Sequence, residues 1–201
     1  EHIEVLRRWI DQGASWDQHW AFTRIKRPEP PALPDDGWSR NAIDQFVLAK
    51  LRSEGLAQGP EADRRTLVRR LALDLTGLPP EPKVVEGFLS DDSDKAYEAL
   101  IERLLESEHW GEHRARYWLD VARYGDTHGI HIDNYREMYP YRDWVIEAFN
   151  TNKPFDEFTV EQIAGDRLPE PTLDQLIASG FHRNNITTNE GGAIPEEWEA
   201  V

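Results

Sequence analysis

The chain has 201 residues, of which 39% are hydrophobic, 10% aromatic and 30% charged, so it is too apolar and too aromatic for a disordered segment. Its 38 acidic and 23 basic residues give a net charge of −15, which argues against nucleic acid or an anionic membrane as a partner. Without cysteine there is no disulfide, no zinc–thiolate site and no covalent haem within these residues. No window approaches the roughly 18 apolar residues that a membrane helix needs.

The first forty residues predict a helix followed by an extended connector. Ile3, Leu6 and Ile10 recur at helical spacing between residues 2 and 12, and Gly13 fits a C-terminal stop. Prolines at 28, 30, 31 and 34 forbid a helix and favour an extended chain. We therefore expect residues 1–15 to be the last helix of a preceding domain, 16–40 a proline-rich connector, and 41–201 a separate domain.

From residue 41 onward almost every pattern is helical. An apolar stripe of Ile43, Phe46, Val47 and Leu51 starts the series, and helices are expected over 61–76, 82–89, 95–106, 112–124 and 141–150. Two capping boxes, Thr159 with Gln162 and Thr172 with Gln175, predict two further helix starts. Strand signals are nearly absent, so the fold class is mainly α, an irregular multi-helix domain with long functional loops and little or no β.

Two long segments without helical period are the places where function is expected. The first, residues 125–140, and the second, 181–195, both lie in the more acidic half of the chain. Residues 101–201 carry 20 acidic and 9 basic residues, a net charge of −11, against 18 and 14, or −4, for residues 1–100. A cation would therefore be attracted to the C-terminal half.

The first loop gathers side chains that serve as metal ligands or as acid/base couples. They are Arg123, Asp126, His128, His131, Asp133 and Arg136, placed beside Gly125 and Gly129. The alternative is a hydrogen-bonded loop whose polar groups satisfy buried backbone.

The second loop combines donors and acceptors with a Gly191-Gly192 pair, which suits recognition of hydroxyl-rich substrates or ligation of a hard cation. Its candidates are His182, Arg183, Asn184, Asn185, Thr187, Asn189 and Glu190. The alternative is a turn leading into a helix with Pro195 at its first position. Asp166, after Gly165, either turns into a pocket or caps a turn.

Residues 109–113, HWGEH, match the H-x-x-E-H zinc motif of one group of metalloproteases. We favour a non-metal interpretation, because Gly111 interrupts the motif and Ser107 is placed as an N-cap, so the match falls in the first turn of a helix. The tryptophans, including Trp110, Trp118 and Trp144, fall on apolar stripes and are expected in the core.

Five ordered blocks carry a resemblance to a known family. They read WSRNAIDQFVLAKLRSEGL, ADRRTLVRRLALDLTGLPPEP, HWGEHRARYWLDVARYGDTHG, YRDWVIEAFNTNKPFDEFTVEQIAGDRLP and GFHRNNITTNEGGAIPEEWEAV. Together they resemble the DUF1549 (PSD1) domain of large planctomycete-type cytochrome c proteins. The preceding HIEVLRRWIDQGASW resembles the last helix of a cytochrome c domain.

The resemblance implies an exported, extracytoplasmic protein, with adjacent cytochrome c and DUF1553-like domains as partners in the same chain. It implies no cofactor within these residues and haem c in the flanking segments. The leading hypothesis is a domain of a multidomain c-type cytochrome, an oxidoreductase or electron-transfer protein acting on extracellular organic matter such as polysaccharide.

In this hypothesis the two loops line one pocket, and no metal ligand is assigned. Acid/base roles fall to Asp126, His128, Asp133 and Glu190, and substrate contacts to Arg123, His131, Arg136, His182, Arg183, Asn185 and Asn189. One alternative is a non-catalytic module that binds glycan or a partner protein. The other is a divalent-metal hydrolase built from His128, His131, Asp133 and Glu190.

Overall fold

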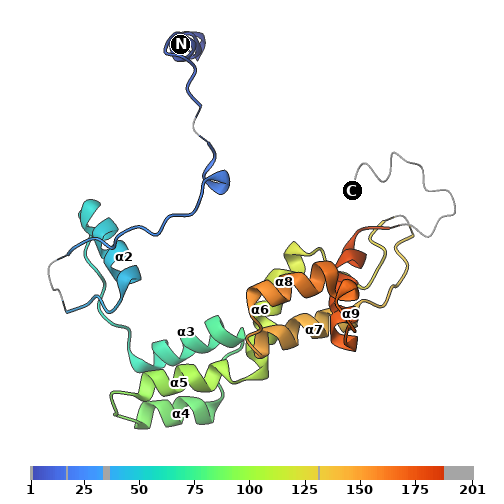
Figure 1. Cartoon of the computed structure of the whole chain (residues 1–201). Helices are drawn as coiled ribbons and strands as arrows, with labels where there is room; N and C mark the ends of the chain where they lie inside the picture. The colour runs from blue at the N-terminus through green and yellow to red at the C-terminus, as the bar shows by residue number, and fades with distance from the viewer. Residues whose placement is uncertain (1, 17, 34–36, 131, 188–201) are drawn as a thin grey trace. The chain divides into compact units, whose positions relative to one another are not determined.

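The computed structural model describes residues 2–16, 18–33, 37–130 and 132–187, and in these ranges it is helical (Figure 1). The only β pairing in the described ranges consists of two isolated bridges, Thr127 with Tyr135 and Gly129 with Thr187. The mainly α fold class is therefore confirmed. None of the helices in these ranges is long and apolar enough to cross a membrane.

The chain divides into two compact units, residues 1–61 and 62–201. The first contains α1 (His2–Asp11), the short 3-10 helix η1 (Trp20–Phe22) and α2 (Ala42–Ser53). Asn41 begins α2 with a capping box in which its side chain and that of Asp44 bond reciprocally to backbone amides. The predicted apolar stripe of α2 is largely exposed to solvent, and the Ile43 side chain is 73% exposed. The one buried side chain of α2 is Leu48, which directly follows Val47 of the stripe but was not part of it.

The second unit begins with three helices side by side: α3 (Arg64–Thr76), α4 (Pro82–Ser90) and α5 (Ala96–Leu105) (Figure 1). Their apolar faces enclose one core, which comprises Val68, Ala72, Leu75, Val84, Phe88, Ala96, Leu100 and Leu104. The Arg64 guanidinium stacks on the Phe88 ring at 4.0 Å and donates to the carbonyl of Asp91. Arg65, Arg69 and Arg70 remain exposed, as predicted for the basic face of this helix.

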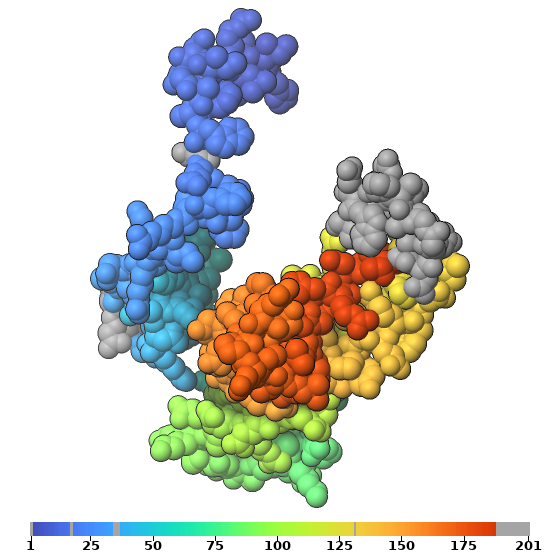
Figure 2. Space-filling view, turned by 45° about the vertical axis from the view of Figure 1, so that its right-hand side comes forward, coloured from blue at the N-terminus to red at the C-terminus, as the bar shows by residue number. Residues whose placement is uncertain are grey.

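The rest of the unit is a second helical cluster: α6 (Glu108–Val121), α7 (Tyr139–Asn150), α8 (Phe155–Ala164), η2 (Gly165–Arg167), α9 (Leu173–Ala178) and η3 (Ser179–Asn184). Its core comprises Ala115, Tyr141, Trp144, Val145, Ala148, Phe158 and Ala178. Figure 2 shows the helices of the second unit, from green to red, packed as one body. Trp144 is buried and Trp118 packs on its cluster, as predicted.

Gly111 lets α6 and α7 approach closely. A Cβ at this position would lie 2.4 Å from Oδ1 of Asn150 and 2.5 Å from the carbonyl oxygen of Ile146. The Gly111 amide donates to the same Oδ1 at 2.7 Å, and Asn150 Nδ2 donates to the carbonyl of Glu108. The glycine that interrupts the metalloprotease motif is thus a packing residue.

One predicted capping box is confirmed and the other is wrong. Thr172 and Gln175 form a box that begins α9. Thr159 lies inside α8, which begins four residues earlier after Pro154, and its hydroxyl donates to the carbonyl of Phe155. The signal failed because a hydroxyl inside a helix can bond back one turn as readily as it caps a new one.

Candidate functional site

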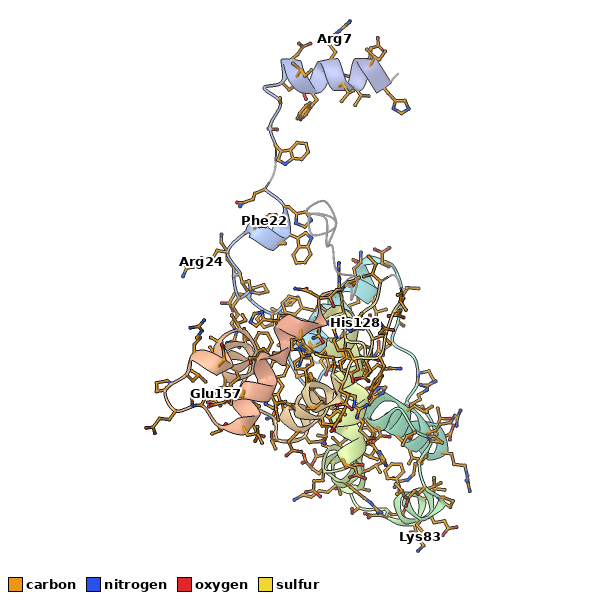
Figure 3. The ribbon with its side chains drawn as sticks, turned by 90° about the vertical axis from the view of Figure 1, so that its right-hand side faces the viewer. Arg7, Phe22, Arg24, Lys83, His128 and Glu157 are labelled. Carbon is orange, nitrogen blue, oxygen red and sulfur yellow. The ribbon has the colours of Figure 1, made fainter. Side chains whose placement is uncertain are left out.

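The two polar loops meet. His128 in the first loop and Thr187 in the second are joined twice, through Nδ1 of His128 and the Thr187 hydroxyl at 2.8 Å, and from the Thr187 amide to the His128 carbonyl at 3.0 Å. The adjacent Gly129 forms the parallel bridge to Thr187. Figure 3 labels His128 in this region, close to the end of η3. We expected residues 123–136 and 182–190 to line one pocket; the two loops are in contact, but the pocket described below is lined by His182 and Arg183 of the second loop and by no residue of 123–136.

Asp126 ties the first loop to the start of α7. Its Oδ1 accepts the Met138 amide at 2.9 Å, its Oδ2 accepts the Tyr124 hydroxyl at 2.7 Å, and its carbonyl accepts the Arg136 amide. Burial of the Tyr124 phenol, together with this bond to a carboxylate, raises the pKa of Tyr124 far above its usual value. Asp126 thus binds groups of its own loop.

Asp133 closes a tight turn. Its φ of +48° is in the left-handed region, and its Oδ1 accepts the Gly129 amide at 2.6 Å. Hydrogen bonds from Thr127 and then from the Gly129 amide, with a smaller contribution from His128, lower the pKa of this exposed carboxyl. Asp133 therefore stays ionised and holds the loop in shape.

Arg136 spans the gap between the loops. Its Nη1 lies 3.4 Å from the Asn185 carbonyl and 3.4 Å from the Thr187 hydroxyl, both neutral acceptors. Its Nε is buried and has no hydrogen-bond partner among the residues that the structure describes. Burial, and next the charge of Arg183, lower the pKa of the Arg136 guanidinium.

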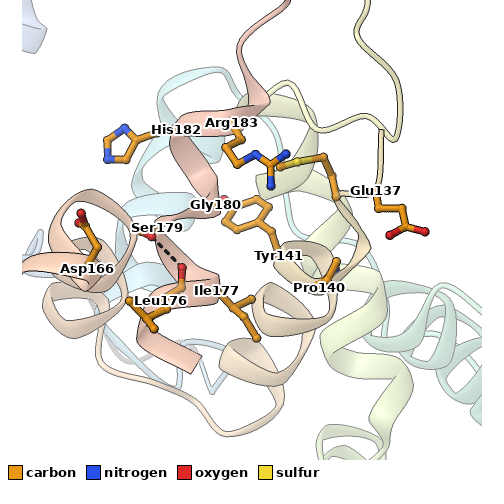
Figure 4. Close-up of a pocket in the computed structure, with 11 residues that line it drawn as sticks. Glu137, Pro140, Tyr141, Asp166, Leu176, Ile177, Ser179, Gly180, His182 and Arg183 are labelled. Atoms are coloured by element: carbon orange, nitrogen blue, oxygen red, sulfur yellow. Dashed lines mark hydrogen bonds between the residues drawn. The ribbon is translucent and has the colours of Figure 1, made fainter. Parts of the chain in front are cut away.

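A pocket of about 540 Å³ lies beside the joined loops, between the start of α7 and η3 (Figure 4). Its apolar part comprises Met138, Pro140, Tyr141, Leu176 and Ile177, and its polar part Glu137, Asp166, Ser179, His182 and Arg183. An apolar lining with a few polar groups is typical of small-ligand sites, and the volume lies in their range of roughly 300–1,000 Å³. Of the two alternatives for Asp166, a pocket residue or a turn cap, the structure places Asp166 in the lining of this pocket.

A buried polar network supports the pocket from below. The Tyr141 hydroxyl donates to Oε1 of Gln162 at 2.6 Å, and the Trp118 indole N–H donates to the same oxygen at 2.9 Å. Burial raises the pKa of Tyr141 to about 12, so the phenol stays protonated. Asn184 is also buried, and neither of its amide atoms has a partner that meets hydrogen-bond geometry.

The predicted site residues fall into four groups. His182 and Arg183 line the pocket, with Nε2 of His182 bonded to the Ile163 carbonyl at 2.9 Å. The joined loops contain Asp126, His128, Asp133, Arg136 and Asn185. Arg123, at φ +56°, follows the end of α6 and is exposed. His131, Asn189 and Glu190 lie outside the described residues.

Sequence reasoning missed several pocket residues. Glu137 and Ser179 carried no motif, and Tyr141 looked like one more apolar position on a helical stripe. Nothing local distinguishes these residues, because the pocket forms only when α7 packs against α9 and η3.

The H-x-x-E-H segment does not gather its side chains around one point. Nδ1 of His109 bonds the Glu112 carboxylate at 2.6 Å, while the His113 ring packs against Gly77 and Tyr117. Across the residues that the structure describes, no three His, Asp or Glu side chains form a group able to hold a metal ion. The alternative hydrolase includes His131 and Glu190, which are outside that set.

A family model described as "PSCyt2: Protein of unknown function (DUF1549)" matches residues 42–201. The match begins where α2 begins and covers all the helices of the second unit. No curated protein gives a significant match. No solved structure gives one either.

Proposed function

Since the chain belongs to the DUF1549 family, we propose that it supplies the substrate-binding pocket of an extracytoplasmic, multidomain c-type cytochrome. In this proposal the protein is an oxidoreductase that acts on extracellular organic matter, specifically a polysaccharide. The observation that carries the proposal is the pocket of about 540 Å³ beside the two hydrogen-bonded polar loops.

Haem c belongs to the neighbouring segments in this proposal. The chain has no cysteine for a thioether bond, and its single methionine, Met138, is 3% exposed within the packed core. These residues do not fit a haem-attachment site, so no chemical step is derived through haem. The adjacent cytochrome c domain is the proposed electron acceptor, and a DUF1553-like domain is a further proposed partner in the same chain.

His128 is the residue we propose for proton transfer. Its Nδ1 is held by the Thr187 hydroxyl, whereas Nε2 makes no hydrogen bond to any described residue. A ring fixed at one nitrogen and free at the other is suited to accept the proton that a substrate hydroxyl loses on oxidation. Asp126 and Asp133 are positioning residues in this proposal, because their carboxylates bind the loop itself.

The second candidate function is a non-catalytic module that binds glycan. The observation that favours it is that the acidic side chains of the first loop are already occupied by loop amides and by Tyr124. Such a module would bind saccharide without haem and without any need for His128.

One experiment tests both functions. Full-length protein carrying its haem is mixed anaerobically with soluble pectin, a sulfated galactan or a β-glucan, and reduction of haem is followed by its absorbance. His128→Gln is compared with His2→Gln, an exposed residue of α1 in the other unit. The oxidoreductase proposal expects at least about a hundredfold slower reduction in His128→Gln, with His2→Gln unchanged.

The other outcomes decide against it. Binding of a saccharide without haem reduction would leave the binding module as the function. Haem reduction that is equal in both variants would remove His128 from the proposal. If the protein binds none of these polymers and its haem is reduced by none of them, the proposed role of the pocket is overturned.

A further inference from the structure

Two arginines come from neighbouring segments where the first loop meets η3: Nη1 of Arg136 lies 3.4 Å from the carbonyl of Asn185, two residues after Arg183. Neither arginine pairs with a carboxylate among the described residues. Arg183 lines the pocket, and its side chain lies above Tyr141 in Figure 4. Arg136 is not one of the lining residues; within the described part of the chain its guanidinium contacts two neutral oxygens, the Asn185 carbonyl and the Thr187 hydroxyl. The mutual repulsion of the two guanidinium groups contributes to the lowered pKa of Arg136.

Two other arginines of this unit, Arg142 and Arg64, are paired or stacked. Arg142 donates from Nε and Nη2 to the Asp143 carboxylate, at 2.9 and 2.7 Å. Arg64 lies on the Phe88 ring and donates to the Asp91 carbonyl. Arg136 has neither a carboxylate nor an aromatic ring beside its guanidinium among the described residues, and its buried Nε, like that of Arg64, has no partner there. An unpartnered, partly buried guanidinium beside a second one is costly unless an anion joins them.

We propose that Arg136 and Arg183 bind the acid group, a carboxylate or a sulfate ester, of the saccharide that the pocket takes. This inference rests on the proposed function, since it names the class of substrate. A guanidinium presents paired N–H donors that match the two oxygens of an oxyanion, and an oxyanion between the arginines removes their repulsion. Neutral saccharides offer no such group.

The carboxylates of the pocket refine the specificity. Glu137 and Asp166 line the same pocket, and Figure 4 shows the Glu137 carboxylate directed away from Arg183. Asp166 lies on η2, across the pocket from Glu137. These two groups accept hydrogen bonds from sugar hydroxyls and repel a second acid group. The pocket therefore selects a ligand with one acid group near the arginines and hydroxyls elsewhere.

The test measures binding by calorimetry with the full-length protein and three probes: an aldobiouronic acid, which has one carboxylate, a singly sulfated galactose disaccharide and neutral cellotriose. The variant Arg183→Gln is compared with Arg69→Gln, which makes the same charge change at an exposed site on α3. We expect Arg183→Gln to weaken binding of at least one acidic probe about tenfold or more, and to change binding of cellotriose less than about twofold. Arg69→Gln should bind as the wild type does.

A second variant keeps the test decisive if Arg183→Gln alters the fold. Arg183→Lys retains the charge and loses the paired donors, so it should fall between wild type and Arg183→Gln while its circular dichroism spectrum stays unchanged. The acidic probe whose binding is weakened by Arg183→Gln identifies the acid group that the site binds, a carboxylate or a sulfate ester. Equal binding of all three probes to wild type and Arg183→Gln overturns the anion site but leaves the saccharide function. If the wild type binds none of the three probes, both the anion site and the saccharide function are overturned.

Discussion

The imidazole of His128 lies 2.8 Å from the hydroxyl of Thr187, although 59 residues separate them in the sequence. The guanidinium of Arg136, further along the first loop, lies 3.4 Å from the same hydroxyl. One threonine therefore connects the end of η3 to two side chains of the first loop.

Replacing Thr187 by valine should loosen the loops without unfolding the helices. Valine has the same shape and lacks the hydroxyl, so the bond to His128 and the longer contact to Arg136 are lost. A hydrogen bond of this kind contributes about 0.5–1.5 kcal/mol, so amides of residues 127–136 should exchange with solvent roughly 2–13 times faster. Thr187→Ser keeps the hydroxyl and should exchange as the wild type does; equal rates in both variants would contradict the role given to this contact.

Gly111→Ala should destabilise the protein by about 1–3 kcal/mol, because the new methyl would overlap Oδ1 of Asn150 and the Ile146 carbonyl. The measurement is the free energy of unfolding in urea. Gly87→Ala is the matched control, because Gly87 lies inside α4 with nothing within 4 Å of an added Cβ. That control should be neutral or stabilising by up to about 1 kcal/mol. Equal effects in the two variants would mean that α6 and α7 are not in close contact at Gly111.

Tyr141 should make the protein lose stability at alkaline pH. Burial raises its pKa from 10.0 to about 12, so the folded state favours the protonated phenol. The contribution of the protonated phenol to the free energy of unfolding is fully present below pH 10. It is lost as the pH rises through 12, and the loss amounts to about 2–3 kcal/mol. Tyr141→Phe should cost about 1 kcal/mol at neutral pH, from the lost bond to Gln162, and flatten the alkaline loss.

The measurement is urea unfolding of wild type and Tyr141→Phe at several alkaline pH values. Tyr135→Phe serves as the control, because Tyr135 is 68% exposed. If Tyr141→Phe and Tyr135→Phe show the same alkaline slope, the phenol of Tyr141 is not held in its protonated form by burial.

Glu161→Gln should destabilise the packing of α8 on α9. Oε2 of Glu161 accepts a hydrogen bond from Nζ of Lys153 at 2.8 Å, Oε1 accepts one from the side-chain Nε2 of Gln175 at 3.2 Å, and the Glu161 side chain is 11% exposed. Breaking a largely buried pair leaves the lysine without its counter-charge, so we expect a loss of about 1–3 kcal/mol in the free energy of unfolding.

The matched control for Glu161→Gln is Glu54→Gln. Glu54 pairs with Lys50 on the surface of α2, where the two side chains are 55% and 74% exposed. Solvent screens that pair, so its loss should cost no more than about 0.5 kcal/mol. A larger effect of Glu54→Gln than of Glu161→Gln would contradict the burial of the Lys153 pair.

The two histidines of α6 should titrate in opposite directions from the ordinary value of 6.5. The bond to Glu112 raises the pKa of His109, whereas desolvation, followed by the charges of Arg116 and Arg114, lowers the pKa of His113. Any stabilisation of the fold by protonated His109 is fully present below pH 6.5, and it is lost as the pH rises through the raised pKa of His109. NMR titration of the imidazole resonances measures both. Glu112→Gln should lower the pKa of His109, and Glu98→Gln, on α5, should not.

The sequence by itself determined the helical fold class, the start of α9 at Thr172 and the family. These depend on local spacing, on a cap that bonds within one turn, and on ordered blocks of residues. It also predicted that the two polar loops line one pocket; the loops are joined through His128 and Thr187, but only the second loop contributes residues to the pocket, His182 and Arg183.

The tertiary structure alone decided what those side chains contact. Asp126 and Asp133 read as acid/base candidates in the sequence, yet their carboxylates accept amides of their own loop. Tyr141 carried no functional signal and forms part of the pocket. The physical reason is that a side chain's partners are set by which helices pack together, and that packing joins residues far apart in the chain. Local spacing records a helix face but not the neighbour that covers it.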